Sequence, residues 1–269
     1  MRISREALGA LPCAVIGDGT PTVVAAGLWP QTGVDSRSLV QGAVTALKAV
    51  TGRRFLVLNR RRGLPSDLTM SQLAGEYADA IRAGLGGPVD VVGTSTGGSI
   101  VQQLAADHPD VVRRLVLIST ASRLEGHGKA LQARVAQLLE AGDVRAAMAM
   151  SATGLAPAGG KVLASVLGRT MGPRLLRDPQ DVADLIATLR AEDGFDLAHC
   201  RGAITAPTLI VGGGRDRFYS VQQFEQTARL IPDAQVRIFP RRGHLSVSSS
   251  PRAQATIRGF LEYSQTRDP

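Results

Sequence analysis

The chain has 269 residues, a formal net charge of +8 at pH 7, 44% hydrophobic residues and 20% charged residues. So large an apolar fraction excludes a largely disordered protein, and the length favours one large α/β domain, or one with an insertion, over two equal domains. No apolar run reaches the roughly 18 residues that a membrane-spanning helix needs, so we expect a cytoplasmic protein with no membrane partner.

The positive charge comes almost wholly from arginine, because three of the 31 basic residues are Lys and 28 are Arg. A chain rich in Ala and Arg but poor in Lys is typical of a GC-rich coding sequence, whatever the function. Nucleic-acid binding favours a Lys/Arg-rich run with interleaved aromatic residues, and the sequence contains no such run. We therefore expect no nucleic-acid partner.

Residues 1–16 have a basic beginning and an apolar stretch, as a signal peptide does. Glu6 interrupts the apolar part, however, and no small-residue cleavage site follows, so we expect this segment to belong to the mature protein. The two cysteines, Cys13 and Cys200, are far apart in the chain. They predict neither a disulfide framework nor a cysteine metal site.

Short apolar runs alternate with longer helical patterns along the chain, which predicts a mostly parallel sheet covered by helices on both faces. The expected strands are 12–16, 22–26, 55–58, 89–92, 114–118, 207–211 and 235–239. The expected helices are 36–50, 69–83, 96–107, 220–230 and 251–263. From about 121 to 192 there are only helical pieces, with expected breaks at 126–128, 154–160 and 172–173. The sequence therefore predicts a core made of residues 1–120 and 197–269, with a helical cap at 121–196.

The most informative segment is Gly93-Thr94-Ser95-Thr96-Gly97, a G-x-S-x-G sequence between an expected strand and an expected helix. In this setting the turn holds a serine hydroxyl above the sheet, and small neighbours let the strand and the helix approach closely. The helix that begins near Thr96 points its free N–H groups at the same place. Ser95 is thus the candidate nucleophile. A structural serine or a phosphate-binding loop is the alternative, although no Lys follows in the phosphate-loop pattern.

A serine hydroxyl needs a base to take its proton, and the chain has four histidines. His108 ends a helix, His127 lies in a Gly-flanked loop and His199 precedes a strand, and these are positions typical of structural or surface residues. His244 follows the expected strand 235–239, at the carboxyl end where open α/β sheets place their chemistry. His244 is therefore the candidate base.

Asp216 is the candidate carboxylate that orients the imidazole. It lies just past the expected strand 207–211, although the neighbouring Arg215 leaves a surface ion pair as the alternative. Ser95, Asp216 and His244 follow one another in the order serine, aspartate, histidine on successive strand ends, and one of the known convergent solutions for serine catalysis has this order. On these motifs the chain resembles the α/β-hydrolase fold superfamily, with a cap inserted after the sixth core strand.

The resemblance implies an α/β protein with a mostly parallel, twisted sheet flanked by helices. It also implies that Ser95 is the nucleophile, His244 the general base and acid, and Asp216 the orienting carboxylate, without cofactor or metal. An oxyanion hole of two backbone N–H groups is expected, from Thr96 and from Leu28. The family usually has His-Gly in the second loop, where this chain has Gly27-Leu28-Trp29, so the N–H group of Trp29 is the alternative donor.

Three residues are candidates for the substrate pocket: Trp29, Met148 and Met150. Core packing is an equal explanation for the tryptophan and the more common one for the methionines. A pocket of this kind suits a small-molecule substrate with an apolar acyl chain or ring. Arg60-Arg61-Arg62 and Arg241-Arg242 both follow strands, so we expect them near the active-site edge of the sheet. Because arginine side chains are usually exposed, solvated loop arginines, one of them paired with a nearby acid, are the favoured explanation. The alternative is that they attract an anionic group on the substrate or an acidic acyl carrier.

The sequence predicts a cofactor-independent serine hydrolase that acts on a carboxylic ester, lactone or thioester through an acyl-enzyme. The alternatives with the same triad are acyl transfer, peracid formation and cleavage of a C–C bond, and a non-catalytic ligand-binding protein of the same fold is less favoured. Haloalkane and epoxide variants of the fold use Asp as nucleophile, and Ser95 argues against them. The substrate and the oligomeric state stay open.

Overall fold

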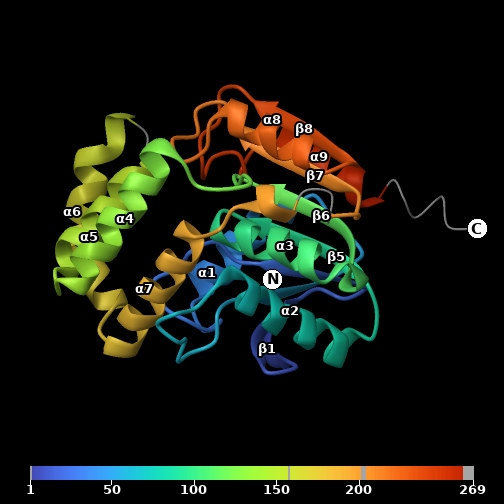
Figure 1. Ribbon diagram of the computed structural model, residues 1–269, viewed down its shortest axis with the longest axis horizontal. Helices are drawn as coiled ribbons and strands as arrows, with labels where there is room; N and C mark the ends of the chain where they lie inside the picture. The colour runs from blue at the N-terminus through green and yellow to red at the C-terminus, as the bar shows by residue number, and fades with distance from the viewer. Residues whose placement is uncertain (1, 157, 201–203, 263–269) are drawn as a thin grey trace, which may run out of the picture.

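The computed structural model describes residues 2–156, 158–200 and 204–262, and their strands form a single sheet (Figure 1). Along the sheet the strand order is β1-β2-β4-β3-β5-β6-β7-β8. Strand β2 is antiparallel to both β1 and β4, and every other neighbouring pair is parallel. The strand bounds are β1 Ile3–Leu8, β2 Leu11–Ile16, β3 Thr20–Ala25, β4 Arg53–Leu58, β5 Val89–Thr94, β6 Val112–Ile118, β7 Thr208–Gly213 and β8 Ala234–Phe239.

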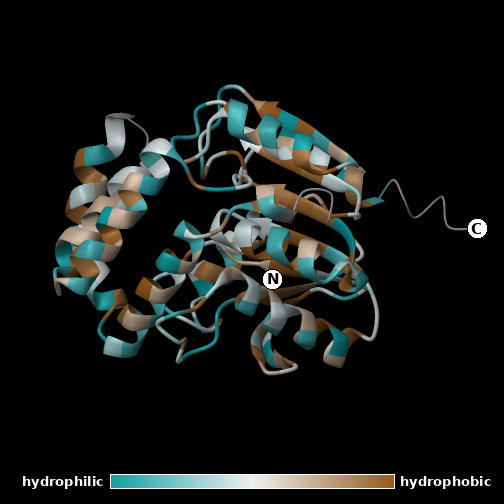
Figure 2. Cartoon of the chain, in the orientation of Figure 1, coloured by the Kyte–Doolittle hydropathy of each residue, from teal (hydrophilic) through white to brown (hydrophobic). Residues whose placement is uncertain are grey.

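Helices cover both faces of this sheet. Neighbouring strand residues point to opposite faces, so Val91 joins the cluster that contains α2, α3 and α8, whereas Val92 joins the cluster that contains α1 and α9. Figure 2 shows hydrophobic residues concentrated on the strands in the middle of the core. The helix bounds are α1 Arg37–Ala43, α2 Met70–Leu85, α3 Thr96–Asp107, α4 Gly126–Glu140, α5 Val144–Leu155, α6 Lys161–Leu175, α7 Pro179–Asp193, α8 Val221–Leu230 and α9 Pro251–Glu262. These layers confirm the predicted fold class.

Two predictions at the start of the chain need correction. The sequence did not indicate β1, because most of its side chains are exposed and an edge strand lacks the apolar run of a buried one. The turn between β1 and β2 needs glycine at Gly9, whose φ is +56° and whose added Cβ would lie 2.9 Å from the Cα atom of Ala80. The predicted helix 36–50 is α1 followed by a separate 3₁₀ turn at Thr45–Leu47, since β-branched residues at 44 and 45 disfavour its continuation.

The predicted break at 172–173 is wrong, because α6 runs through Pro173 to its end at Leu175. Two glycines on one face of α6 let its backbone pack closely on α5. A Cβ on Gly168 would lie 2.5 Å from the carbonyl oxygen of Met148, and one on Gly172 would lie 2.3 Å from the Cβ atom of Met148. The helix is therefore held by packing that a local pattern does not reveal. The last predicted helix agrees up to residue 262, and Tyr263 lies outside the described residues.

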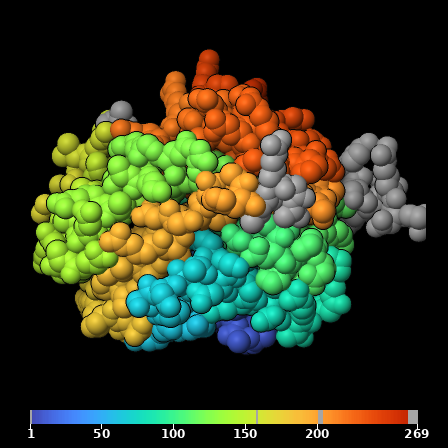
Figure 3. Space-filling model, viewed as in Figure 1, coloured from blue at the N-terminus to red at the C-terminus, as the bar shows by residue number. Residues whose placement is uncertain are grey.

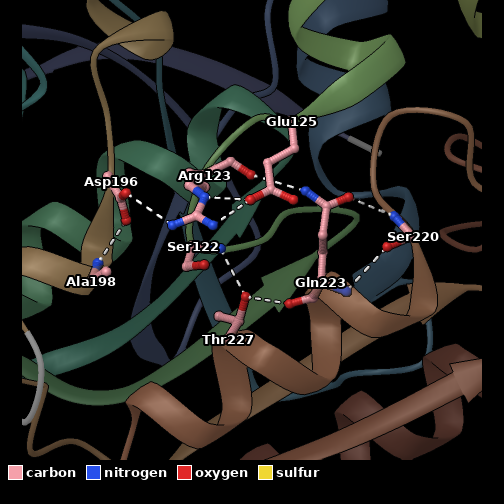
Figure 4. Close-up of polar contacts among 8 residues, drawn as sticks. All are labelled: Ser122, Arg123, Glu125, Asp196, Ala198, Ser220, Gln223 and Thr227. Atoms are coloured by element: carbon pink, nitrogen blue, oxygen red, sulfur yellow. Dashed lines mark hydrogen bonds and ion pairs between the residues drawn. The ribbon is translucent and has the colours of Figure 1, made fainter.

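Helices α4–α7 form an insertion between β6 and β7, and polar contacts tie its two connections to the core together (Figure 4). Arg123, near the start of the insertion, pairs with Glu125 and donates a 3.1 Å hydrogen bond to Asp196, near its end. The backbone N–H of Ser122 donates to the hydroxyl of Thr227 on α8 at 2.8 Å. The cap therefore joins the core through a cross-linked pair of segments. The cap boundaries at 121 and 196 stay a prediction.

Helix α7 joins the cap to the segments that follow β3 and β4. The carboxylate of Asp184 accepts hydrogen bonds from the backbone N–H groups of Gly63 at 3.0 Å and Leu64 at 2.8 Å. Asp181 accepts two more, from the backbone N–H and the hydroxyl of Thr32, at 3.3 and 3.2 Å. Figure 3 shows the amber α7 in contact with the light-blue segment after β4. None of the helices in the described parts of the chain is long and apolar enough to cross a bilayer.

Candidate active site

Ser95 lies on the turn between β5 and α3, in a strained backbone conformation. Its φ is 53° and its ψ is −126°, in the left-handed region that side chains rarely adopt. The backbone N–H of Ser95 donates a 2.9 Å hydrogen bond to the carbonyl of Ile118 at the end of β6. The turn thus holds the Ser95 hydroxyl at the carboxyl end of the parallel strands.

The glycines around Ser95 are required by close approach of other atoms. A Cβ on Gly97 would lie 2.3 Å from the carbonyl oxygen of Ala25 and 2.5 Å from that of Ala26. A Cβ on Gly93 would lie 2.4 Å from a methyl carbon of Val101. Larger side chains at either position would force the turn away from β3 or α3, and this is the physical reason for the G-x-S-x-G pattern here.

Three side chains from distant parts of the sequence form one hydrogen-bonded series. The Nε2 atom of His244 lies 3.0 Å from the hydroxyl oxygen of Ser95, and its Nδ1 atom lies 2.9 and 3.1 Å from the two carboxylate oxygens of Asp216. The side chains of His244 and Asp216 are only 5% and 0% exposed. Asp216 also accepts hydrogen bonds from the backbone N–H groups of Phe218 and Tyr219, at 2.8 and 3.2 Å. The carboxylate is thereby held facing the imidazole.

A second serine in a left-handed conformation supports His244. Ser119 follows β6 with a φ of +50°, and its backbone N–H donates to the carbonyl of Val211 at 2.9 Å. Its hydroxyl donates a 2.7 Å hydrogen bond to the backbone carbonyl of His244. The ring of Phe218 also packs on the imidazole, with centroids 4.7 Å apart. Sequence reasoning missed Ser119, whose only local signal is its position at a strand end.

The loop after β3, which carries the expected second oxyanion donor, lies beside the turn that carries Ser95. A Cβ on Gly27 would lie 3.6 Å from the Cβ atom of Ser95. The side chain of Leu28 packs against the apolar cluster of the cap helices, and Thr96 is the first residue of α3. The loop after β3 therefore runs close to Ser95 at Gly27, the residue before Leu28.

A buried glutamate of the cap contacts the first turn of α3, next to Ser95. Glu192, at the end of α7, is 1% exposed and accepts hydrogen bonds from the hydroxyls of Thr96 at 2.7 Å and Ser99 at 2.9 Å. Gln132 of α4 donates a third, at 3.0 Å. Burial raises the pKa of Glu192, and the three donors act in the opposite direction. No sequence motif pointed to Glu192.

The three candidate pocket residues lie in different surroundings. Met150 lines a pocket of about 420 Å³ in the cap, together with residues of α4, α5 and α6. Met148 packs between α5 and α6, against Gly172. Trp29 is half-buried against the core cluster that contains α1 and α9, and its carbonyl accepts a hydrogen bond from Arg60. The structure does not bring these three side chains together.

Each of the three arginines that follow β4 makes a hydrogen bond or an ion pair within the chain. Arg60 differs from the expected solvated residue, because it is 2% exposed and donates a 2.9 Å hydrogen bond to the hydroxyl of Thr188 on α7. Burial lowers the pKa of its guanidinium to about 10. Arg61 pairs with Glu76 at 2.8 Å. Arg62 pairs with the carboxylate of Asp178 at 2.7 Å.

Among the described residues, the remaining arginines and histidines considered as candidates make no hydrogen bond to the side chains of Ser95, His244 and Asp216. Arg241 is exposed and Arg242 half-buried on the turn that precedes His244. His108 caps the end of α3, as expected. The expected loop position of His127 is wrong, because His127 lies in the first turn of α4, where it lines the same pocket as Met150. His199 lies in a short 3₁₀ helix at Leu197–Cys200. In the described part of the chain, no group of three His, Cys, Asp or Glu side chains is arranged to hold a metal ion.

Comparison with known protein families identifies the family of this chain. A sequence model described as the Alpha/beta hydrolase family matches residues 22–257. The chain belongs to the α/β hydrolase family. The resemblance expected from the sequence motifs is therefore confirmed.

Relatives of this α/β hydrolase have several activities. It is 28% identical to the pimeloyl-acyl-carrier-protein methyl ester esterase of Chromobacterium violaceum over 204 residues. The matched segment covers 72% of this chain and 77% of that protein. It is 25% identical to a 2-hydroxy-6-oxononadienedioate/2-hydroxy-6-oxononatrienedioate hydrolase of a Pseudomonas species over 162 residues. The matched segment covers 57% of this chain and 56% of that protein. The enol-lactonase of Burkholderia xenovorans LB400 has the same fold, with a TM-score of 0.72 at 20% identity over 97% of this chain and 100% of that one.

Proposed function

We propose that this α/β hydrolase is a serine esterase that cleaves a carboxylic ester through an acyl-enzyme. The observation that carries the proposal is the hydrogen-bonded series from Asp216 through His244 to Ser95. In this arrangement a buried carboxylate holds one imidazole nitrogen, and the other nitrogen faces the serine hydroxyl, as proton transfer requires. The likeness to a methyl ester esterase supports the ester as the bond that is cleaved.

The proposed reaction has two halves. Ser95 Oγ bonds to the ester carbonyl carbon while His244 Nε2 takes the hydroxyl proton. The tetrahedral intermediate then collapses, and the alcohol leaves with that proton. Water next attacks the acyl-enzyme, giving one proton to His244, and the carboxylic acid departs as Ser95 recovers its proton. The carboxylate of Asp216 orients the imidazole and stabilises the imidazolium that forms.

The backbone N–H groups of Thr96 and Leu28 are the proposed oxyanion donors. The first belongs to the free N-terminus of α3, where the helix dipole favours negative charge. The second lies one residue after Gly27, the residue that lies beside the Ser95 turn. Main-chain donors of this kind act without reorganisation and contribute about 3 kcal/mol each to transition-state stabilisation.

A second candidate function is hydrolysis of a C–C bond, which the likeness to the Pseudomonas dienedioate hydrolase favours. Both reactions use the same triad and differ in the leaving group, so the substrate decides between them. Hydrolysis of lactones and thioesters, acyl transfer and peracid formation use the same acyl-enzyme with other acyl donors or acceptors. A panel of 4-nitrophenyl esters, lactones, thioesters and ring-opened dienoic acids would rank them.

The decisive experiment is a burst of 4-nitrophenol from an activated ester. We expect one equivalent per protein molecule, and labelling of Ser95 by a fluorophosphonate. Ser95→Ala should abolish both, with a loss of turnover of about 10⁴-fold or more. Ser71→Ala is the matched control, because Ser71 is an exposed serine on α2 that bonds Asp107. Absence of both burst and labelling in the wild-type protein would contradict the proposed function and leave a non-catalytic ligand-binding protein.

A further inference from the structure

The pocket in the cap is lined by both apolar and basic residues. Its volume is about 420 Å³, within the range of sites for small molecules. The apolar lining comes from Leu131, Ala149 and Met150, on α4 and α5. A volume of this size suits part of a small molecule, whereas a folded carrier protein would contact an outer face.

The basic lining comes from both the cap and the core. Lys161 and Arg169 lie eight residues apart on one face of α6, with Ser165 between them. Arg217, in the turn after β7, lines the same pocket. Lys161 is half-buried, whereas the two arginines are exposed.

These three cations have no acidic partner among the residues that the structure describes. This distinguishes them from Arg61 and Arg123, each of which pairs with a carboxylate. Like charges that gather around a concave surface focus a positive potential into it, and such a potential attracts anions. Anion attraction is only the alternative explanation for residues 60–62 and 241–242, and the three cations of this pocket lie elsewhere in the chain.

The pocket adjoins the triad through a shared segment of chain. Arg217 directly follows Asp216, and the ring of Phe218 packs on His244 with centroids 4.7 Å apart. A Cβ on Gly128 of α4 would lie 2.8 Å from the carbonyl oxygen of Phe218, so α4 lies against this same segment. Arg217, which lines the pocket, therefore lies in the chain between Asp216 and Phe218, the two residues that contact the His244 side chain.

We infer that this pocket binds the remote carboxylate of a small ester substrate, with Lys161, Arg169 and Arg217 as the anion-binding residues. The inference rests on the proposed function and adds the class of substrate, an ester whose acyl part carries a second, ionised carboxyl group. The apolar chain of that acyl group lies on Leu131 and Met150. The three cations contribute to substrate binding, and they take no part in bond cleavage.

The test compares two esters of equal chain length, mono-4-nitrophenyl adipate and 4-nitrophenyl hexanoate. We expect kcat/KM to favour the anionic ester, and this preference to decrease as salt is added. Lys161→Gln, Arg169→Gln and Arg217→Gln should each lower kcat/KM for the adipate about 3- to 10-fold, mainly through KM, and leave the hexanoate within about 2-fold. Arg174→Gln is the matched control, since Arg174 lies on α6 and donates to Thr170.

A binding measurement separates this inference from the proposed esterase activity. Calorimetry of Ser95→Ala with free adipate should detect binding that the triple variant at 161, 169 and 217 has lost. Equal kcat/KM for the two esters, unchanged by the three substitutions, would overturn the inference even if the burst at Ser95 is seen. If the wild-type protein releases no nitrophenol from either ester, adipate binding alone decides, and an absence of binding overturns the inference. Retained hexanoate activity shows that the variants are folded.

Discussion

The carboxylate of Glu192 accepts a 2.7 Å hydrogen bond from the hydroxyl of Thr96, the residue that follows Ser95 in the chain. This contact joins the last helix of the cap to the first turn of α3. Ser99, one turn further along α3, donates to the other carboxylate oxygen at 2.9 Å. The position of the cap is therefore coupled to the backbone that carries the proposed nucleophile.

The first prediction concerns the pH dependence of stability. Because burial raises the pKa of Glu192, the folded protein holds this proton more tightly than the unfolded chain does. The contribution of the protonated Glu192 side chain to folding stability is therefore complete below the ordinary glutamate pKa of 4.5. It is lost as the pH rises through the higher pKa of the folded state. Relative to Glu192→Gln, the wild type should lose at most about 1.4 kcal/mol of stability per pH unit above 4.5. Urea unfolding of both proteins at several pH values measures this, and a constant difference would contradict it.

The second prediction concerns Ser119. Ser119→Ala removes the hydrogen bond to the carbonyl of His244, so the imidazole loses one of its supports. We expect kcat to fall about 10-fold with little change in KM, because misplacement of a base affects the transition state more than substrate binding. Steady-state kinetics on an activated ester measures kcat and KM separately. Ser246→Ala serves as the comparison, since the Ser246 hydroxyl bonds the backbone N–H of Gly243 on the same turn. An unchanged kcat in Ser119→Ala would show that the contact does not position His244.

The third prediction tests close packing at the Ser95 turn. Gly97→Ala places a methyl group 2.3 Å from the carbonyl oxygen of Ala25, so β3 and α3 must separate. We expect a loss of about 2 kcal/mol or more in the free energy of unfolding, together with loss of the nitrophenol burst. Gly259→Ala on α9 is the matched control, because a Cβ there meets no atom within 4 Å. That control should be neutral or stabilise by up to about 1 kcal/mol. Equal effects of the two substitutions would contradict the prediction.

The fourth prediction compares two adjacent arginines. Arg60→Ala leaves the carbonyls of Trp29 and Gln31 and the hydroxyl of Thr188 without their buried donor. We expect a loss of about 3 kcal/mol in the free energy of unfolding, since each unsatisfied buried group costs 1 kcal/mol or more, roughly. Arg61→Ala removes a partly exposed ion pair with Glu76 and should cost less than about 1 kcal/mol. Thermal and urea unfolding measure both, and similar losses would show that burial of Arg60 is unimportant.

The sequence by itself determined the features that depend on local patterns. The alternation of apolar runs and helical periods predicted the parallel sheet, and the G-x-S-x-G turn singled out Ser95. The strand-end positions of Asp216 and His244 led to the same edge of the sheet, because carboxyl ends of parallel strands lie together there. Each of these signals occupies a few consecutive residues. They can therefore be read without knowing which distant segments meet.

Only the tertiary structure decided which distant side chains share a site. Glu192 contacts a residue 96 positions earlier in the chain, and the hydroxyl of Ser119 bonds a carbonyl 125 positions later. The consecutive arginines at 60–62 look alike in the sequence, yet Arg60 is buried against α7 and the other two pair with carboxylates. Burial and partnership depend on packing between elements, and residues far apart in the chain leave no local pattern of that packing. For the same physical reason, the sequence does not show that Lys161 and Arg169 of α6 line one pocket with Arg217 of the turn after β7.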